Sequence, residues 1–369
     1  MNLPPEIIDQ GFMQMAYALA EKARGWASPN PYVGAVVVKG EKIVGYGYHE
    51  QPGKPHAEVV ALRRAGKEAK GSTLYVTLEP CVHWGRTPPC VETILRFRPK
   101  RVVISALDPN PIVYKKGVKK LKEAGIEVAL GCLGEKNQRL NEAYIKYITQ
   151  RLPWVILKAG LSMDGKIAAA DGSSRWVTGP LAREYTHLLR GEADALLVGI
   201  NTVIRDNPQL TVRHPLWGKK QLVRVILDSR LRLPLESRLL KTFQKGPILI
   251  FTSREAPFKK KKELAAKGAE IMEVDMQQGR LDLKAILKEL ARRGLASVLV
   301  EGGSQVLTSF LEQKLADKLF LHFAPRLLGG QKAPSLFAGQ GFAPLRRGLG
   351  LRQSRIFSLG QDFILEGYL

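Results

Sequence analysis

The densest group of potential metal ligands in the sequence is the segment "EPCVHWGRTPPC" (79–90). It contains Cys81, His83 and Cys90, and cysteine and histidine are common zinc ligands in proteins. The chain has only three cysteines, which argues against a disulfide scaffold, and paired cysteines in a reducing compartment more often bind metal. The segment predicts a metal site and leaves open which of the three residues are ligands.

A second segment, "PHAEV", supplies a further ligand and a carboxylate. His56 and Glu58 lie at the expected start of a helix. Residues two apart in the middle of a helix point to different sides, so only the irregular first turn lets both serve one site. The zinc-deaminase signature is H-x-E followed by P-C-x-x-C, with the Glu as proton shuttle and not as ligand. The first half matches literally, whereas eight residues separate Cys81 from Cys90.

This combination predicts hydrolytic deamination of a ring. One histidine and two cysteines leave the fourth tetrahedral position to water, as in catalytic zinc sites. Zinc lowers the pKa of bound water toward 7, so hydroxide is available at neutral pH to attack the amino-bearing carbon. Glu58 would pass the proton to the leaving amine. His83 remains open at this point, as a ligand or as a contact to the substrate.

Alternating strands and helices must position these residues. In the first half the expected strands are 33–40, 42–49, 72–80, 101–109 and 126–131, and the expected helices are 12–23, 56–66, 91–97, 117–125 and 137–152. In the second half the expected strands are 154–162, 193–203, 222–228, 247–252, 296–303 and 318–325. Such alternation predicts mainly parallel sheets covered on both faces. We expect two α/β domains, residues 1–150 and 151–369, with a boundary near 150–153.

Composition limits the classes of partner. The net charge of +23 could indicate nucleic acid, phosphorylated small molecules or a basic surface. The charge is spread over both halves in proportion to length, and the run "FKKKKELAAK" from Phe258 is typical of the solvated face of a helix. No apolar run approaches the roughly 18 residues of a membrane span, and the N-terminal segment lacks the pattern of a signal peptide. We therefore expect a cytoplasmic protein without a nucleic-acid or membrane partner.

The first half resembles the pyrimidine deaminase domain of bifunctional riboflavin-biosynthesis enzymes. The matching segments are "SPNPYVGAVVV" (28–38), "HAEVVAL" (56–62) and "TLEPCVHWGRTPPC" (77–90). The resemblance implies a cytidine-deaminase-like three-layer α/β/α domain. It implies one zinc ion per chain, with Glu58 as the catalytic proton shuttle and His56, Cys81 and Cys90 as the metal ligands. Asn30 and His83 would then contact the deaminase substrate.

The second half resembles the reductase domain of the same family. The matching segments are "LKAGLSMDGKIAAADGSSRWVTG" (157–179), "HLLRGEADALLVGINTVIRDNPQLTVR" (187–213), "ILDSRLRLP" (226–234) and "VLVEGGSQVLTSFL" (298–311). The resemblance implies a dihydrofolate-reductase-like α/β domain that uses NADPH. Independently of it, the glycine pair before the last expected helix could hold a pyrophosphate, because free N–H groups and the helix dipole favour anions there.

The resemblance also assigns positions in the reductase. Substrate-side positions are Lys158, Ser174, Arg190, Leu210, Arg213 and Glu301, of which the two arginines suit a 5′-phosphate because a guanidinium binds phosphate in a fork. Coenzyme-side positions are Gly160, Trp176, Thr202, Asp206, Ser229, Gly303, Ser304, Gln305, Val306, Leu307, Thr308 and Ser309. The segment "TSRE" (252–255) is a weaker candidate for the 2′-phosphate. Asp206, Lys158 and Glu301 are candidate proton donors that the sequence does not rank.

The family's substrate is a phosphorylated pyrimidine ribosylamine, deaminated first and then reduced from ribosyl to ribityl. The resemblance further implies a homodimer or larger homo-oligomer joined through the reductase domain. The alternative is a nucleic-acid base deaminase, of the kind that acts on tRNA, with an accessory domain. A zinc-stabilised binding module is a non-enzymatic alternative, although a structural site would take a fourth protein ligand and need no adjacent Glu. A third alternative is a chain in which one of the two halves has lost its activity.

Overall fold

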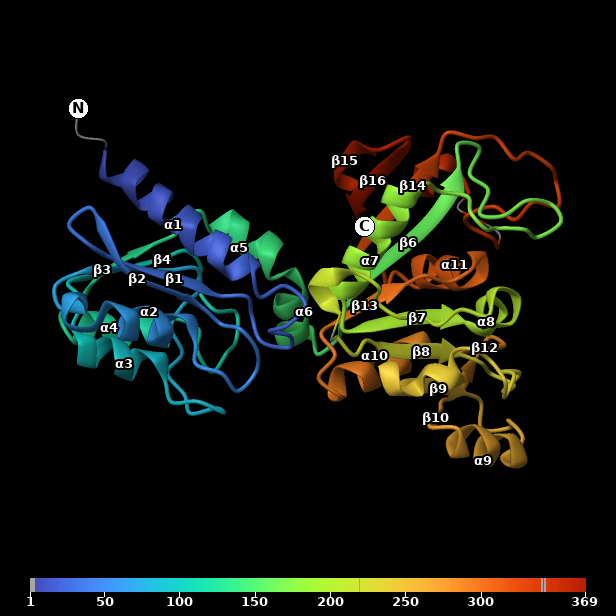
Figure 1. The fold of residues 1–369 in the computed structure, drawn as a ribbon, viewed down its shortest axis with the longest axis horizontal. Helices are drawn as coiled ribbons and strands as arrows, with labels where there is room; N and C mark the ends of the chain where they lie inside the picture. The colour runs from blue at the N-terminus through green and yellow to red at the C-terminus, as the bar shows by residue number, and fades with distance from the viewer. Residues whose placement is uncertain (1–3, 219, 340, 342) are drawn as a thin grey trace. The chain divides into compact units, whose positions relative to one another are not determined.

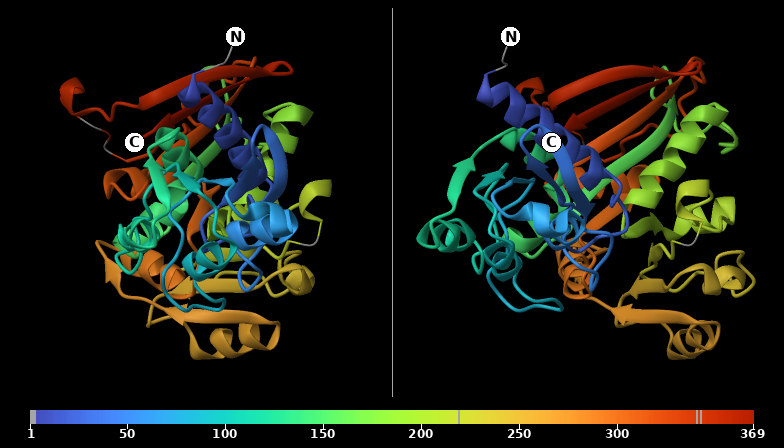
Figure 2. Two further views of the ribbon diagram at one scale, coloured as in Figure 1. Left: turned by 90° about the vertical axis from the view of Figure 1, so that its left-hand side faces the viewer. Right: turned by 60° about the vertical axis from the view of Figure 1, so that its left-hand side comes forward.

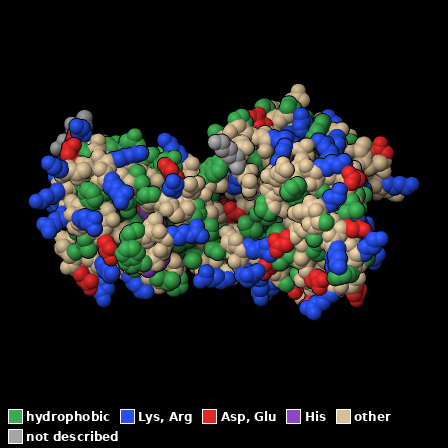
Figure 3. All heavy atoms as spheres, turned by 60° about the horizontal axis from the view of Figure 1, so that its bottom comes forward, with side chains coloured by type: hydrophobic (Ala, Val, Ile, Leu, Met, Phe, Trp, Pro, Cys, Tyr) green, Lys and Arg blue, Asp and Glu red, His purple; other side chains and the backbone are tan. Residues whose placement is uncertain are grey.

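The protein is described by a computed structural model that covers residues 4–218, 220–339, 341 and 343–369. The chain divides into two compact units, Met1–Leu152 and Pro153–Leu369, and each unit has its own sheet (Figure 1). The expected alternation of strands and helices is present in both. Lys and Arg side chains are spread over both units on the face shown in Figure 3, with Asp and Glu between them. Among the described residues, no helix is long and apolar enough to cross a membrane.

The N-terminal unit is built on a five-stranded sheet in the order β2-β1-β3-β4-β5. Strand β1 pairs antiparallel with β2, as the hairpin signal in the sequence predicts, and also with β3, whereas β3, β4 and β5 are parallel. The strands are β1 Gly34–Lys39, β2 Lys42–Tyr48, β3 Thr73–Val76, β4 Arg101–Ile104 and β5 Glu127–Leu130.

Helices cover both faces of this sheet, which makes three layers. One cluster of buried side chains joins α1 to the sheet through Met13, Ala16 and Val36, and a second joins α2, α3 and α4 to the opposite face. The helices are α1 Pro5–Glu21, α2 Ala57–Ala65, α3 Cys90–Phe97, α4 Lys116–Glu123, α5 Gly134–Leu140 and α6 Glu142–Gln150, with a short 3-10 turn η1 at Gly66–Ala69.

The helix expected over 137–152 is wrong as a single element, because it is broken into α5 and α6 at Asn141. The side chain of Asn141 accepts a hydrogen bond from the Tyr32 N–H at 2.7 Å and donates to the Tyr32 carbonyl at 3.1 Å. An asparagine that bonds a distant backbone in this way competes with helical hydrogen bonding. The break therefore ties the end of the unit to the segment before β1.

The C-terminal unit contains a nine-stranded sheet in the order β10-β9-β8-β7-β13-β6-β14-β16-β15. The strands from β10 to β14 in this order are parallel, and β16 is antiparallel to β14 and to β15. The hairpin of β15 and β16 forms one edge (Figure 2). The strands are β6 Trp154–Ser162, β7 Ala195–Gly199, β8 Val223–Leu227, β9 Ile248–Thr252, β10 Ala269–Glu273, β13 Ser297–Val300, β14 Lys318–Ala324, β15 Arg352–Leu359 and β16 Asp362–Tyr368.

The central strands of this sheet are buried on both faces. Leu196 and Val198 of β7 join a cluster with α7, α8 and α9, and the intervening Leu197 is equally buried. This explains why the strands have nearly continuous apolar sequences. The helices are α7 Pro180–Glu192, α8 Ile200–Asp206, α9 Phe258–Ala266, α10 Leu283–Arg292 and α11 Ser304–Glu312, with 3-10 turns at Pro215–Trp217, Leu240–Lys245 and Leu345–Arg347, and a small hairpin of β11 Met276–Gln277 and β12 Arg280–Leu281.

Candidate functional sites

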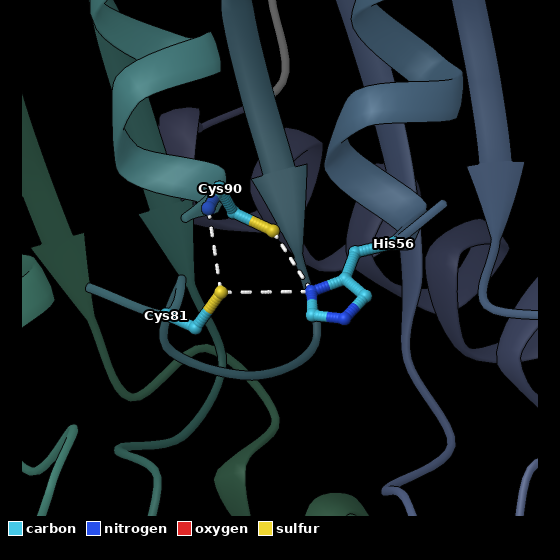
Figure 4. Close-up of side chains that lie close together, drawn as sticks. All are labelled: His56, Cys81 and Cys90. Carbon is cyan, nitrogen blue, oxygen red and sulfur yellow. Dashed lines mark hydrogen bonds between the residues drawn. The ribbon is translucent and has the colours of Figure 1, made fainter. Parts of the chain in front are cut away.

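His56, Cys81 and Cys90 converge on one point in the N-terminal unit (Figure 4). The Nδ1 atom of His56 lies 3.0 Å from Cys90 Sγ and 3.6 Å from Cys81 Sγ. All three potential ligand atoms lie within 4.8 Å of one another, and they are the only such group of three found in the described residues. One nitrogen and two sulfurs at this spacing match the donor set and size of a tetrahedral zinc site with one open position. His83 is not in this group.

Three separate elements bring these side chains together. Helix α2 begins just after His56, whose backbone is extended, and Cys90 is the first residue of α3. Cys81 lies in the loop after β3, and its sulfur accepts a hydrogen bond from the Cys90 N–H at 3.3 Å. Bonds from the Cys90 thiol, from the imidazole and from this N–H lower the pKa of Cys81, as expected for a thiolate beside donors at a helix start.

Close packing of α2 on the sheet sets the position of the His-x-Glu pair. A Cβ atom on Gly45 of β2 would lie 2.2 Å from the Ala61 carbonyl, and one on Gly47 would lie 2.6 Å from Val60 Cβ. Any larger residue would push the helix outward, so these glycines are required for the close approach. Glu58, in the first turn of α2, is thereby buried to 4% exposure. Burial raises the pKa of its carboxyl, which suits a group that must both accept and release a proton.

A cavity of about 320 Å³ is lined by two of the three potential ligands, His56 and Cys81, and by Glu58. Asn30 and His83, the two expected substrate contacts, both line it. The amide of Asn30 lies 2.9 Å from His49 Nε2, and His49 Nδ1 lies 3.3 Å from the Pro55 carbonyl. His83 Nδ1 is buried and has no hydrogen-bond partner in the structure. The two residues thus face the space next to the metal-binding group.

The cavity also contains residues that the sequence reasoning missed. Asp108 and Asn110, from the "DPNP" turn after β4, line it together with Tyr144 of α6. The Tyr144 hydroxyl donates to Asp108 at 2.8 Å, and the Asn110 N–H donates to the same oxygen at 2.9 Å. Burial raises the pKa of Asp108 to about 6. A polar turn directly after a buried strand was the available signal, since such turns commonly carry site residues.

A larger cavity, about 900 Å³, lies in the C-terminal unit at the carboxyl ends of β6, β7, β8 and β13. In the sheet order, β13 lies between β6 and β7, two strands that follow one another in the chain. Ligands of open α/β sheets commonly bind where the strand order changes in this way. The expected site residues that line the cavity are Lys158, Gly160, Ser174, Thr202, Asp206, Ser229, Glu301, Gly303, Ser304, Gln305, Val306 and Ser309.

Six of the expected residues do not line this cavity: Trp176, Arg190, Leu210, Arg213, Leu307 and Thr308. Leu307 and Thr308 are buried in the packing of α11, and Leu210 is also buried. Trp176 is exposed, with the Arg183 guanidinium 4.8 Å from its ring centre. In the "TSRE" segment, Thr252 and Ser253 are buried and donate to the Ser229 carbonyl. They support the loop of Ser229 instead of lining the cavity.

A backbone cradle borders the cavity between β7 and β13. Cβ atoms on Gly199 and Gly302 would lie 2.8 and 2.7 Å from Val306, whereas a Cβ on Gly303 would meet nothing within 4 Å. Gly303 precedes α11 without a side-chain cap, so the first N–H groups of this nine-residue helix keep their capacity to bind an anion. Together with the cationic side chains that line the cavity (Lys158, Arg205, Arg232, Arg280 and Lys332), this fits a phosphorylated dinucleotide.

The side chain of Arg190 forms an ion pair with Glu301. Its guanidinium makes two hydrogen bonds of 2.7 Å to the carboxylate of Glu301 and a third to the Thr211 carbonyl. Each side chain of the pair is 13% exposed. Glu301 in turn faces the cavity with Lys158, whose pKa burial lowers to about 8. Arg190 therefore orients Glu301, while Arg213 keeps its guanidinium free of any carboxylate within 4 Å among the described residues.

Both units match known protein families. Residues 7–106 match the cytidine and deoxycytidylate deaminase zinc-binding region, and residues 153–365 match the RibD C-terminal domain. Across the whole chain, the riboflavin biosynthesis protein RibD of Aquifex aeolicus is 46% identical over 97% of this chain and 98% of its own. The RibD of Bacillus amyloliquefaciens is 43% identical over 97% and 95%.

This chain belongs to the RibD family. It is a bifunctional deaminase and reductase of riboflavin biosynthesis, with a zinc-binding deaminase domain and an NADPH-dependent reductase domain. Solved RibD structures have the same two-domain fold. Acinetobacter baumannii RibD is 38% identical with a TM-score of 0.88, over 98% of this chain and 99% of its own. The Thermotoga maritima deaminase/reductase is 36% identical with a TM-score of 0.86, over 98% and 99%.

The RibD match confirms the predicted fold classes and family, and both cofactors. The nucleic-acid base deaminase is not favoured, because whole-chain RibD relatives account for the second unit as well as the first. The roles of the individual site residues stay predictions.

Proposed function

We propose that the N-terminal unit deaminates 2,5-diamino-6-ribosylamino-4(3H)-pyrimidinone 5′-phosphate. The C-terminal unit then reduces the ribosyl group of 5-amino-6-ribosylaminouracil 5′-phosphate to ribityl. The observation that carries the first step is the triangle of His56, Cys81 and Cys90, two of which line a cavity together with the buried Glu58. One zinc ion bound there would supply a Lewis acid that makes water nucleophilic at neutral pH.

In this mechanism, residues of the protein transfer the proton and orient the pyrimidine ring. Glu58 takes a proton from the attacking water and delivers it to the leaving amine, which its raised pKa assists. Asn30, held by His49, and His83 line the space that the pyrimidine would occupy. These polar groups fix the orientation of the ring.

The reductase step uses the second cavity. NADPH bound there would supply the hydride, and the Gly302–Gly303 cradle would hold its pyrophosphate. Lys158 and Glu301 both line this cavity, close enough for their charges to interact. We assign Lys158 as the proton donor, because a pKa of about 8 leaves its ammonium protonated at neutral pH yet able to give up the proton.

A coupled assay tests the two activities separately on one preparation. Ammonia release reports deamination, and loss of NADPH absorbance with the deaminated intermediate reports reduction. In Glu58→Ala we expect ammonia release to fall at least 100-fold, the usual contribution of a general acid–base group, while reduction stays unchanged. Ammonia release that survives in this variant would contradict the assignment of Glu58.

We also propose a homodimer or larger assembly joined through the reductase domain, in the cytoplasm. Strand β15 supports the assembly, because it is an edge strand whose Ile356 is 71% exposed, and such edges readily pair with another chain. Light scattering on Ile356→Lys compared with the parent tests it, and an unchanged mass would refute this interface. A reducing cytoplasm is consistent with the three free cysteines.

A further inference from the structure

The hydroxyl of Thr87 contacts the imidazole of the proposed zinc ligand His56 at the ring nitrogen that does not face the cysteines. Its Oγ1 atom is 3.2 Å from His56 Nε2, while Nδ1 of the same ring points at the two cysteine sulfurs. The same ring also packs against His49, whose ring centre is 5.0 Å away in an edge-to-face arrangement. The orientation of the imidazole is thus determined from outside the ligand set.

The chemistry of the imidazole ring decides which partner in this contact donates the hydrogen bond. A neutral imidazole carries one N–H, and only the other nitrogen has a lone pair for a metal. With Nδ1 directed at the metal position, the proton must be on Nε2, where it needs an acceptor. Thr87 Oγ1 is the acceptor that the structure supplies. Partners of this kind fix the tautomer and orientation of metal-ligating histidines and raise their basicity.

The local sequence holds Thr87 in place. The Gly85 N–H donates to the Thr87 carbonyl at 3.2 Å, which closes a tight turn. Pro88 and Pro89 follow, and Cys90 begins α3 directly after them. Proline fixes its own φ and restricts the residue before it to extended conformations, so the distance from Thr87 to Cys90 can change little.

We propose that Thr87 is a positioning residue for zinc, which accepts the Nε2–H of His56 and holds Nδ1 toward the metal. The proposal rests on the ligand set His56, Cys81 and Cys90. It also gives the long spacing between the cysteines a second use, because Thr87 lies within it.

The test measures zinc release from the purified holoprotein to a chromophoric chelator. Thr87→Val keeps the branched shape but removes the acceptor, and we expect its affinity for zinc to fall 10- to 100-fold, the usual effect of losing such a partner, with faster release. Thr87→Ser retains the hydroxyl and should release zinc as the parent does. Thr149→Val serves as a matched control, because Thr149 is exposed and its hydroxyl donates to the Ile145 carbonyl of its own helix.

Two outcomes would overturn the proposal: a Thr87→Val affinity within twofold of the parent, or a Thr87→Ser affinity as poor as that of Thr87→Val. Circular dichroism of the metal-free proteins checks that Thr87→Val folds; if it does not, Thr87→Ala replaces it with the same expectation. Cys90→Ser separates this proposal from the ligand set. Full zinc binding by Cys90→Ser would refute the ligand set, whereas normal zinc retention by Thr87→Val would refute only the role of Thr87.

Discussion

Replacing Arg190 by methionine removes one half of a buried ion pair and leaves the other half in place. The Glu301 carboxylate would lose two hydrogen bonds of 2.7 Å in a site where its side chain is 13% exposed. Breaking a buried pair by removing one partner costs about 3–5 kcal/mol, because an uncompensated charge remains. Lys158 is close enough to lower the pKa of Glu301 and compensates in part. We therefore expect Arg190→Met to lower the free energy of unfolding of the reductase unit by about 3 kcal/mol.

Thermal unfolding measures this loss. For a unit of 150–250 residues, 1 kcal/mol shifts Tm by roughly 2–4 °C, so the reductase unit of Arg190→Met should melt roughly 6–12 °C lower. NADP⁺ identifies the relevant transition, because a ligand stabilises only the unit that binds it. Arg254→Met is the matched control. It breaks a 2.9 Å pair with Asp275 whose side chains are 72% and 70% exposed, and exposed pairs contribute at most about 1 kcal/mol.

The double variant decides between an ion pair and simple loss of packing. Arg190→Met with Glu301→Met removes both charges, and buried pairs replaced by apolar residues often keep or gain stability. We expect the double variant to recover most of the lost Tm. A shift under about 2 °C in Arg190→Met, or a double variant no more stable than the single one, would refute the reasoning.

Three further predictions concern the two sites. Cys90→Ser should lose zinc, whereas His83→Ala should keep it and raise KM or lower kcat for deamination; zinc content and kinetics together check this, and zinc loss in His83→Ala would make His83 the ligand. Reduction should slow as pH rises through about 8, because the Lys158 ammonium loses its proton there; a rate that is flat or rising from pH 7 to 9 contradicts the donor role. Arg232 lines the cavity and lies in the loop after β8. We expect Arg232→Gln to weaken the binding of 2′,5′-ADP about 10-fold or more and to leave the binding of 5′-AMP unchanged. Arg230→Gln, in the same loop, should change the binding of neither nucleotide.

The sequence was most informative where chemistry and local pattern coincide. The HAE motif, the cysteine spacing and the apolar strands are local signals, and the fold they predict is confirmed. The Arg190–Glu301 pair joins residues 111 positions apart, and no periodicity shows which carboxylate an arginine will meet. The break at Asn141 was missed for the same reason, since its bonds go to Tyr32. Side-chain partners across the fold decide such features, and they exist only once the elements have packed.

The loop from Cys81 to Cys90 serves two functions at once. Several of its residues, His83 and Arg86 among them, form part of the cavity wall, while its ends carry both sulfurs. Ordering the loop for one ligand therefore lowers the entropic cost of binding the other. Thermodynamic linkage then requires reciprocity. Bound pyrimidine should increase the protein's affinity for zinc by the same factor by which bound zinc increases its affinity for the pyrimidine. Scarcity of zinc would weaken capture of the substrate as well as its conversion.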